Sequence, residues 1–84
     1  MVAIVIYCSG YCPYCERARA LLERKGVAFE EIRLDQEPER RAEMEERAGG
    51  RTSVPQIFFG DRHIGGFDDM AALENAGELD AVLQ

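Results

Sequence analysis

The apolar residues in the first half of the chain predict strands that alternate with helices. An unbroken apolar run at Val2–Tyr7 is typical of a buried strand. Apolar residues then recur with helical spacing, which predicts a helix at Pro13–Lys25 that Gly26 ends in the C′ position. A second strand is expected where apolar and charged residues mix between Phe29 and Leu34.

The second half of the chain predicts another helix and then a hairpin. Glu37–Ala48 is charged and helix-prone, with a proline near its start, and Gly49-Gly50 stops it. The strand Gln56–Phe59 and the segment around His63-Ile64 flank Gly60-Asp61-Arg62, which is a predicted hairpin turn. A last helix, with an expected break or bend near its single glycine, is marked by Met70, Leu73, Leu79, Val82 and Leu83.

The order of these elements is β-α-β-α-β-β-α, which predicts an α/β fold with a four-stranded mixed sheet flanked by three helices. At 84 residues the chain suits one domain, residues 1–84, with one modest core. It is too small for a cofactor-binding domain plus a substrate domain. We therefore expect a monomer that works with partner proteins or small molecules and holds no bound cofactor.

Charge and hydropathy exclude two classes of partner. Ten Lys plus Arg against 16 Asp plus Glu give a net charge of −6, whereas nucleic-acid binding needs a basic surface. No apolar stretch is long enough to span a bilayer, and the first residues read as a strand without a basic leader. Three cysteines, one of them outside a CxxC pair, suit a reducing compartment, so we expect a cytoplasmic protein without nucleic-acid or membrane contacts.

Cys12 and Cys15 form a CxxC pair between a strand and a helix. A Cys in the first turn of a helix lies among unpaired N–H groups at the positive end of the helix dipole, where a thiolate is favoured. Pro13 suits the first helical position, which needs no N–H donor. We therefore expect Cys12 to be a nucleophile with a pKa well below the free value of about 8.5. Cys15, three residues on and within disulfide reach, would resolve the mixed disulfide.

The third cysteine, Cys8, opens two alternative interpretations of the cysteines. A zinc site needs four ligands, and only Cys8 and His63 are left to join the CxxC pair. Their predicted places, at a buried strand end and in a distant hairpin, disfavour this set. The C-x3-C-x2-C spacing also resembles the cluster motif of radical S-adenosylmethionine enzymes, whose barrel-like folds need roughly 200 residues. We interpret Cys8 as a small packing residue at the strand end, with a third redox role as the alternative.

The segment Thr52–Pro55 precedes the predicted third strand. Alone it fits an ordinary loop into an edge strand, because proline is common at strand starts. Together with an upstream CxxC it indicates a cis proline that turns the preceding backbone outward. Val54 can then offer its N–H and C=O to an extended peptide backbone, as in strand addition.

The segment Gly65–Asp69 leads into the last helix. It fits a glycine turn followed by an N-cap aspartate. A helix N-terminus approached through glycines is also an anion site with free N–H groups for a carboxylate, and an adjoining Asp can hold an ammonium group. A γ-glutamyl end carries both groups, so the segment fits it chemically.

Three motifs occur in order, namely CPYC, T-S-V-P and G-G-F-D-D, with I-Y before the first and Q-I-F-F-G after the second. In this order and spacing they resemble, from about residue 2 to residue 83, the short bacterial dithiol glutaredoxins of the glutaredoxin 3 type. The resemblance implies a thioredoxin fold and glutathione-dependent thiol–disulfide exchange, with glutathione as the reducing co-substrate. The implied partners are glutathione and disulfide-containing or glutathionylated proteins, ribonucleotide reductase among them.

Roles for individual residues follow from the same resemblance. Cys12 is the nucleophile and Cys15 the resolving thiol. Val54 and Pro55 are implied to hold the cysteinyl backbone of glutathione. Arg41 matches the family's contact to the glycyl carboxylate, with Arg40 as a competitor for that place. The implied glutathione-binding set is Tyr14, Arg41, Ser53, Val54, Pro55, Gly66, Phe67 and Asp68.

One departure from the family pattern affects the glutathione groove, and two other functions stay as alternatives that single residues disfavour. Ser9 stands where the family usually has Lys, which removes one cationic contact to glutathione worth about 0.5 to 1 kcal/mol. A glutaredoxin-like electron donor that takes electrons from thioredoxin reductase usually has a Trp in the segment that here reads Gly65–Phe67, and this chain has no Trp. A dimer that holds a [2Fe-2S] cluster between two glutathiones usually has Gly or Ser in place of Pro13.

Overall fold

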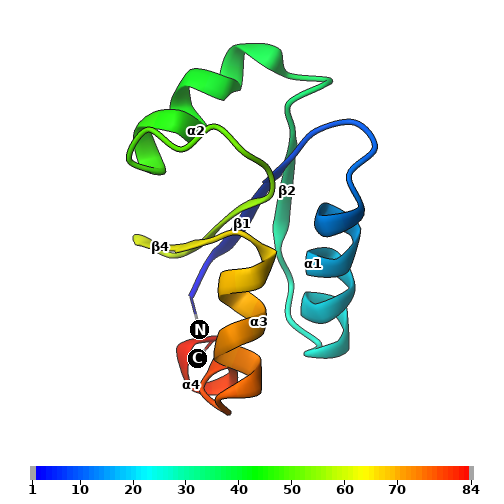
Figure 1. Cartoon of the computed structure of the whole chain (residues 1–84), viewed down its shortest axis with the longest axis vertical. Helices are drawn as coiled ribbons and strands as arrows, with labels where there is room; N and C mark the ends of the chain where they lie inside the picture. Colours follow the sequence, from blue (N-terminus) through cyan, green and yellow to red (C-terminus); the bar gives the residue numbers. More distant parts are fainter. Residues whose placement is uncertain (1, 84) are drawn as a thin grey trace.

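The computed structural model describes residues 2–83, which form a sheet with helices on both faces (Figure 1). The strands are β1 (Ile4–Cys8), β2 (Glu30–Arg33), β3 (Gln56–Phe59) and β4 (Arg62–Gly65). They lie in the order β2-β1-β3-β4, with β1 and β2 parallel and the other two pairs antiparallel. The predicted four-stranded mixed sheet is therefore confirmed.

The hairpin between β3 and β4 is tighter than the sequence suggested. Only Gly60 and Asp61 form the turn, whereas Arg62 already belongs to β4 and pairs with Phe59. Gly60 has a φ of +61°, a left-handed conformation that glycine adopts without steric cost.

The helices are α1 (Pro13–Arg24), the 3-10 helix η1 (Pro38–Arg40), α2 (Arg41–Arg47), α3 (Phe67–Asn75) and α4 (Leu79–Leu83). The helix expected at residues 37–48 thus begins as a 3-10 turn, in which the N–H of Arg40 bonds to the C=O of Glu37 at 3.0 Å. The last predicted helix is broken at Gly77, where φ is +74°. Four α-helices, rather than three, therefore flank the sheet in the described residues.

Two apolar clusters fill the two sides of the sheet. Helices α1, α3 and α4 cover one face, which we call the thiol face because its buried cluster includes Cys8 and Cys15. The other buried members of that cluster are Ile4, Ile6, Ala18, Leu21, Leu22, Ile57, Phe59, Met70, Leu79 and Leu83. Helix α2 covers the opposite face, which we call the α2 face, with Tyr7, Ile32, Leu34, Met44, Ala48 and Phe58.

Side chains of adjacent residues in β1 and in β3 serve opposite faces. Ile6 lies in the thiol-face cluster and Tyr7 in the α2-face cluster, while Ile57 and Phe58 divide in the same way. Because side chains alternate along a strand, the nearly continuous apolar runs of the sequence supply both cores at once. No helix in residues 2–83 has the length and apolar character to cross a membrane.

Candidate active site

Cys12 is the N-cap residue of α1. Its backbone is extended, with φ −145° and ψ 104°, and Pro13 takes the first helical position. The Cys12 Sγ accepts a hydrogen bond from the Cys15 N–H at 3.2 Å. The predicted placement of the first thiol at a helix start is confirmed, because the sulfur acts as the cap of the helix.

Cys15 lies one turn into α1 and only 1% of its surface is exposed. Its neighbour in the thiol-face cluster is Cys8, which is equally buried at the end of β1. A hydrogen bond with the Cys8 thiol, and then burial, raise the pKa of Cys15 far above its ordinary value. Cys15 is therefore a protonated thiol behind the more accessible Cys12, and Cys8 packs against the pair.

The pKa of Cys12 departs from the sequence-based expectation. Burial raises the pKa of the Cys12 thiol most, followed by its hydrogen bond with the Cys15 thiol, while the Cys15 N–H lowers it. Burial outweighs the capping hydrogen bond, so the predicted pKa well below 8.5 is contradicted by these local contacts. What the geometry supports is the order of the two thiols, with Cys12 titrating below Cys15.

The loop before β3 brings a second motif to the first thiol. The Val54–Pro55 peptide bond is cis, as expected from the sequence. The Cys12 Sγ lies 4.0 Å from the Val54 carbonyl oxygen, and Val54 is only half-buried. Residues 42 positions apart in the chain thus form one edge of a common site.

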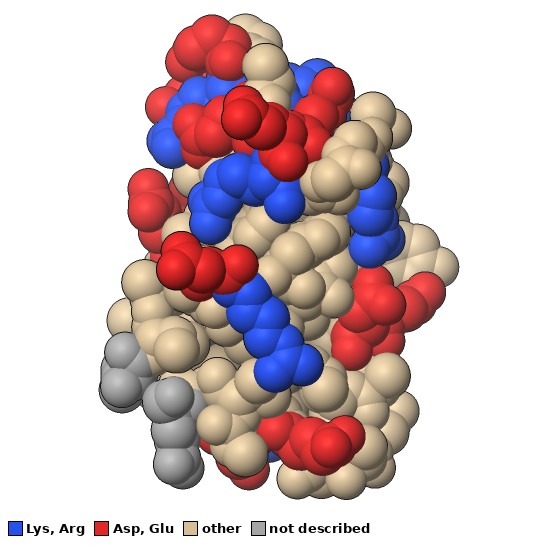
Figure 2. Space-filling view, turned by 90° about the vertical axis from the view of Figure 1, so that its left-hand side faces the viewer, with Lys and Arg blue, Asp and Glu red and all other residues tan. Residues whose placement is uncertain are grey.

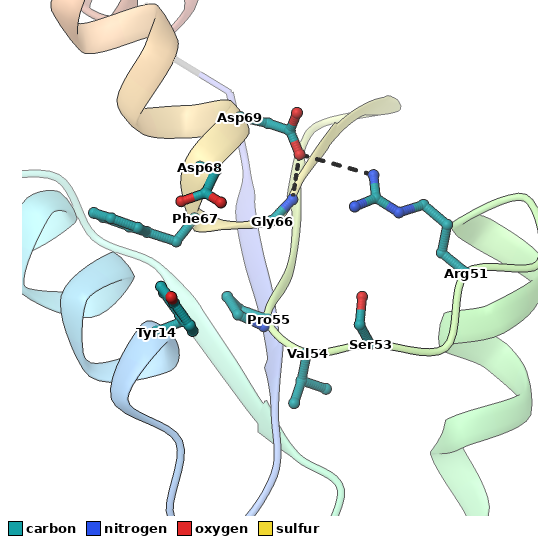
Figure 3. Close-up of a pocket in the computed structure, with 9 residues that line it drawn as sticks. All are labelled: Tyr14, Arg51, Ser53, Val54, Pro55, Gly66, Phe67, Asp68 and Asp69. Atoms are coloured by element: carbon teal, nitrogen blue, oxygen red, sulfur yellow. Dashed lines mark hydrogen bonds and ion pairs between the residues drawn. The ribbon is translucent and has the colours of Figure 1, made fainter.

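A pocket of about 230 Å³ lies beside this edge, between the start of α1, the loop before β3 and the start of α3 (Figure 3). The ring centroids of Tyr14 and Phe67 lie 6.4 Å apart, and the two rings form one wall. Its lining residues are Tyr14, Arg51, Ser53, Val54, Pro55, Gly66, Phe67, Asp68 and Asp69. The structure therefore brings together seven of the eight residues that the resemblance assigned to glutathione.

Arg41 is the one member of that set outside the pocket lining. Its guanidinium donates to the Thr52 carbonyl oxygen at 3.0 Å, just ahead of the pocket loop, and forms an ion pair with Glu45 at 3.8 Å. Arg40, the competitor for the same place, is bound to Glu37 and Glu43. Of the two arginines, Arg41 lies nearer the pocket loop.

Sequence reasoning missed two charged residues of the pocket. Asp69 Oδ2 accepts the Gly66 N–H at 2.9 Å and forms an ion pair with Arg51 at 3.8 Å (Figure 3). Asp69 thereby braces the turn into α3, while the N–H groups of Phe67 and Asp68, the first two residues of that helix, have no partner within it. The sequence did offer a signal for Asp69, because an acidic residue three positions after an N-cap residue, here Gly66, is typical of a capping box.

The charges on α2 are distributed differently from those of the pocket. Acidic and basic side chains interleave over the top of the molecule, where η1 and α2 lie (Figure 2). They neutralise one another in pairs, such as Arg40 with Glu43 at 3.0 Å. In the pocket, Arg51 and Asp69 form a longer ion pair at 3.8 Å, and both side chains are about half exposed.

The cysteines and the histidine do not form a metal site. Within residues 2–83 no group of three His, Cys, Asp or Glu side chains is arranged to hold a metal ion. His63 bonds to Gln56 at 2.7 Å and stacks on Phe58, on the α2 face. Cys8 and Cys15 lie in the cluster on the other face of the sheet.

This arrangement defines the class of the protein. A CxxC pair at a helix start, beside a cis-proline loop in a four-stranded mixed sheet, is the architecture of thiol–disulfide oxidoreductases with a thioredoxin fold. A family model described as Glutaredoxin matches residues 4–64. The chain belongs to the glutaredoxin family, as the resemblance implied.

Individual relatives agree with this assignment over nearly the whole chain. A glutaredoxin of Pseudomonas aeruginosa is 57% identical over 83 residues, which cover 99% of this chain and 98% of that protein. Glutaredoxin 3 of Escherichia coli is 50% identical over 84 residues, with 100% of both chains covered. The crystal structure of a buckwheat glutaredoxin–glutathione complex is similar with a TM-score of 0.87 at 32% identity, and covers 98% of this chain and 76% of that one.

Proposed function

We propose that this protein is a glutathione-dependent oxidoreductase that reduces protein–glutathione mixed disulfides and protein disulfides. The observation that carries the proposal is the 4.0 Å approach of the Cys12 Sγ to the Val54 carbonyl, at the edge of the pocket. A disulfide whose glutathione half lies along Val54 would have its sulfur next to Cys12. In this proposal glutathione is a co-substrate, and no resident cofactor takes part.

Reduction of a mixed disulfide needs only the first thiol. The Cys12 thiolate attacks the glutathionyl sulfur, the substrate S–S bond breaks, and the protein leaves as a thiolate that takes up a proton. A second glutathione thiolate then attacks the glutathionyl sulfur on Cys12. Glutathione disulfide leaves and the Cys12 thiolate is restored.

Reduction of a protein disulfide needs both thiols. Cys12 first forms a mixed disulfide with one sulfur of the substrate, and the other sulfur leaves. Cys15 then loses its proton, attacks the Cys12 sulfur and releases the second substrate thiol, which leaves a Cys12–Cys15 disulfide. Two glutathiones reduce that bond and leave as glutathione disulfide. The raised pKa of Cys15 fits this order, because a protonated resolving thiol does not compete for the first attack.

Contacts to glutathione are proposed for two parts of the pocket and for Arg41 beside it. The Val54 backbone pairs with the cysteinyl unit, flanked by Ser53, Pro55 and Tyr14. The start of α3, with Gly66, Phe67 and Asp68, receives the γ-glutamyl end. Arg41 reaches the glycyl carboxylate. Arg51 lines the same pocket and is an additional cation for that carboxylate.

A coupled assay tests the proposal. Turnover of a glutathionylated substrate is measured with glutathione plus glutathione reductase, and separately with thioredoxin reductase as the electron source. We expect turnover with the first system. Turnover with the second system alone would instead favour an electron donor to ribonucleotide reductase.

A visible absorbance spectrum of the fresh protein tests for a cluster-binding dimer, and we expect a colourless protein. The proposed location is the cytoplasm, whose reducing glutathione pool the reaction requires.

A further inference from the structure

Behind the pocket, one buried amide connects three elements of the fold. Gln56, at the start of β3, has no exposed surface. Its side-chain nitrogen donates to the Ser53 carbonyl oxygen at 2.9 Å and lies 3.3 Å from the Ser53 hydroxyl. Its side-chain oxygen lies 2.7 Å from the Nε2 of His63 in β4. Both ends of the buried amide are therefore hydrogen-bonded.

These contacts fix the orientation of both side chains. The Ser53 carbonyl can only accept a hydrogen bond, so the NH₂ end of Gln56 must face it. The amide oxygen then faces His63, whose Nε2 must carry the proton. The His63 ring stacks on Phe58 with centroids 4.8 Å apart, and the Arg47 guanidinium lies 4.2 Å from the Phe58 ring centroid. His63 of β4 thus fixes the Gln56 side chain, and the His63 ring is in turn held by its stacking on Phe58 in the cluster of the α2 face.

The orientation of the Ser53 carbonyl determines that of the next N–H. The Ser53–Val54 peptide is trans, and in a planar trans peptide the C=O and the N–H point in opposite directions. Because the Ser53 carbonyl points at the buried Gln56, the Val54 N–H points away from it. Within residues 2–83 that N–H has no backbone acceptor, and Val54 lines the pocket.

We infer that Gln56 and His63 are positioning residues that aim the Val54 N–H into the pocket, where the backbone of glutathione pairs with it. The inference rests on the proposed function. It assigns a role in ligand binding to two residues that lie outside the pocket lining. Their effect is on ligand affinity, because a backbone hydrogen bond to the bound peptide is present equally in the ground state and the transition state.

Two variants test this role. Gln56→Leu removes both hydrogen-bonding ends at similar size, and His63→Phe keeps a ring on Phe58 but removes the donor to Gln56. The Kd of S-methylglutathione, an unreactive ligand, is measured by amide NMR titration of the reduced protein. We expect Gln56→Leu to raise the Kd about three- to tenfold, as for one lost hydrogen bond, and His63→Phe about twofold. The Val54 amide should stop responding to the ligand in Gln56→Leu, while the Phe67 amide still responds.

Kinetics and a matched control separate positioning from general packing. The KM for a glutathionylated substrate should rise with kcat nearly constant, and the alkylation rate of Cys12 should not change. Tyr7→Phe removes a buried polar contact on the α2 face without touching the loop, so it should leave the Kd unchanged. An equal rise of the Kd in Tyr7→Phe would overturn the inference.

The remaining outcomes distinguish this inference from the proposed function. If the unaltered protein binds S-methylglutathione and Gln56→Leu binds it equally well, the inference fails and the proposed function stands. If Gln56→Leu does not fold, His63→Phe decides, and an unchanged Kd in that variant overturns the inference. If the unaltered protein does not bind the ligand at all, both the proposed function and the inference fail.

Discussion

The two faces of the sheet are filled by different chemistry. On the thiol face, α1, α3 and α4 bury aliphatic side chains together with Cys8 and Cys15. On the α2 face, the apolar cluster borders a chain of polar contacts, in which the Tyr7 hydroxyl bonds to Glu43 and accepts from Arg47 at 3.0 Å. A second and separate set of hydrogen bonds on this face joins His63 and Gln56 to Ser53 in the pocket loop.

The difference separates two tasks. The apolar core holds α1 against the sheet and buries Cys15, whose raised pKa keeps it protonated. Cys12 is therefore the more accessible of the two thiols. Hydrogen bonds are directional, so the polar face can fix the orientation of a single peptide group. Changes on the thiol face should therefore alter the chemistry, and changes on the α2 face should alter stability or ligand affinity.

The largest expected effect comes from the thiols. Cys12→Ser should lower both activities by at least about a thousandfold, because the attacking sulfur is lost. Cys15→Ser should keep activity on glutathione mixed disulfides and lose most reduction of protein disulfides, since only the second route needs a resolving thiol. Both substrates are assayed with glutathione as reductant. Equal loss of the two activities in Cys15→Ser would contradict the monothiol route.

Cys8→Ser is the control for that experiment. It keeps a small polar group in the core next to Cys15, so we expect both activities to stay nearly intact. A large loss would make Cys8 a functional thiol.

Alkylation against pH sharpens the contrast between the two thiols. Burial and the Cys8 thiol raise the pKa of Cys15, whereas Cys12 caps α1 and is less buried. The alkylation rate of Cys12 with iodoacetamide should therefore reach its midpoint at a lower pH than that of Cys15, measured by mass spectrometry of each peptide. Cys12→Ser and Cys15→Ser proteins identify the two curves. A lower midpoint for Cys15 would reverse the assigned roles.

Gly65 is the last residue of β4 and lies two residues before α3 begins. A substitution there tests the connection between the sheet and a helix of the thiol face. Its φ is +117°, and a Cβ there would clash with the Asp69 carboxylate. We expect Gly65→Ala to lower the free energy of unfolding by about 2 to 3 kcal/mol, measured by urea denaturation. Gly66→Ala is the matched control, because its nearest neighbour would lie at 3.6 Å. Equal losses in both variants would show that backbone conformation is not the cause.

Tyr7→Phe tests the α2 face alone. It removes the hydroxyl bonds to Glu43 and Arg47 while the ring keeps its edge contact with Phe58. We expect a loss of about 1 kcal/mol in the free energy of unfolding and unchanged kcat and KM. A fall in kcat would mean that the two faces are not separate in function.

The smallest expected effect is the pH dependence of stability that His63 contributes. Burial, and then Arg51, lower the pKa of His63, with Arg47 adding to this and Asp69 opposing it. Because the folded pKa is depressed, this stability is present above the ordinary pKa of about 6.5 and is lost as the pH falls toward the lowered value. Between pH 7.5 and 5 the free energy of unfolding should fall by a fraction of a kilocalorie per mole more than in His63→Phe. Parallel curves would exclude His63 as the source.

Local patterns in the sequence predicted most of the elements. The apolar run at β1, the proline at the start of α1 and the glycine that separates α3 from α4 each act on their nearest neighbours, so they can be read without knowledge of the fold. Two boundaries were wrong, namely the start of the second helix, where η1 forms, and the start of β4 at Arg62. Such boundaries depend on whether a single hydrogen bond forms at the end of an element.

The sequence also identified the candidate site, but not how its parts are held. The spacing of CPYC and the T-S-V-P segment was enough to name Cys12, Cys15, Val54 and Pro55, because each motif carries its own backbone conformation. It did not indicate Arg51, whose ion pair with Asp69 in the pocket joins residues 18 positions apart in the chain. Nor did it indicate that burial would outweigh the helix cap in the pKa of Cys12.

Only the tertiary structure decided which thiol is buried and that the N–H of the Ser53–Val54 peptide points toward the pocket. Burial is a property of the packed core, so the raised pKa of Cys15 appears only once Cys8 and α1 are packed together. The contacts that link Ser53, Gln56 and His63 likewise join a loop and two strands. The sequence alone determined where the reactive motifs lie along the chain, because they depend on adjacent residues. The fold determined their environment, because that depends on residues far apart in sequence.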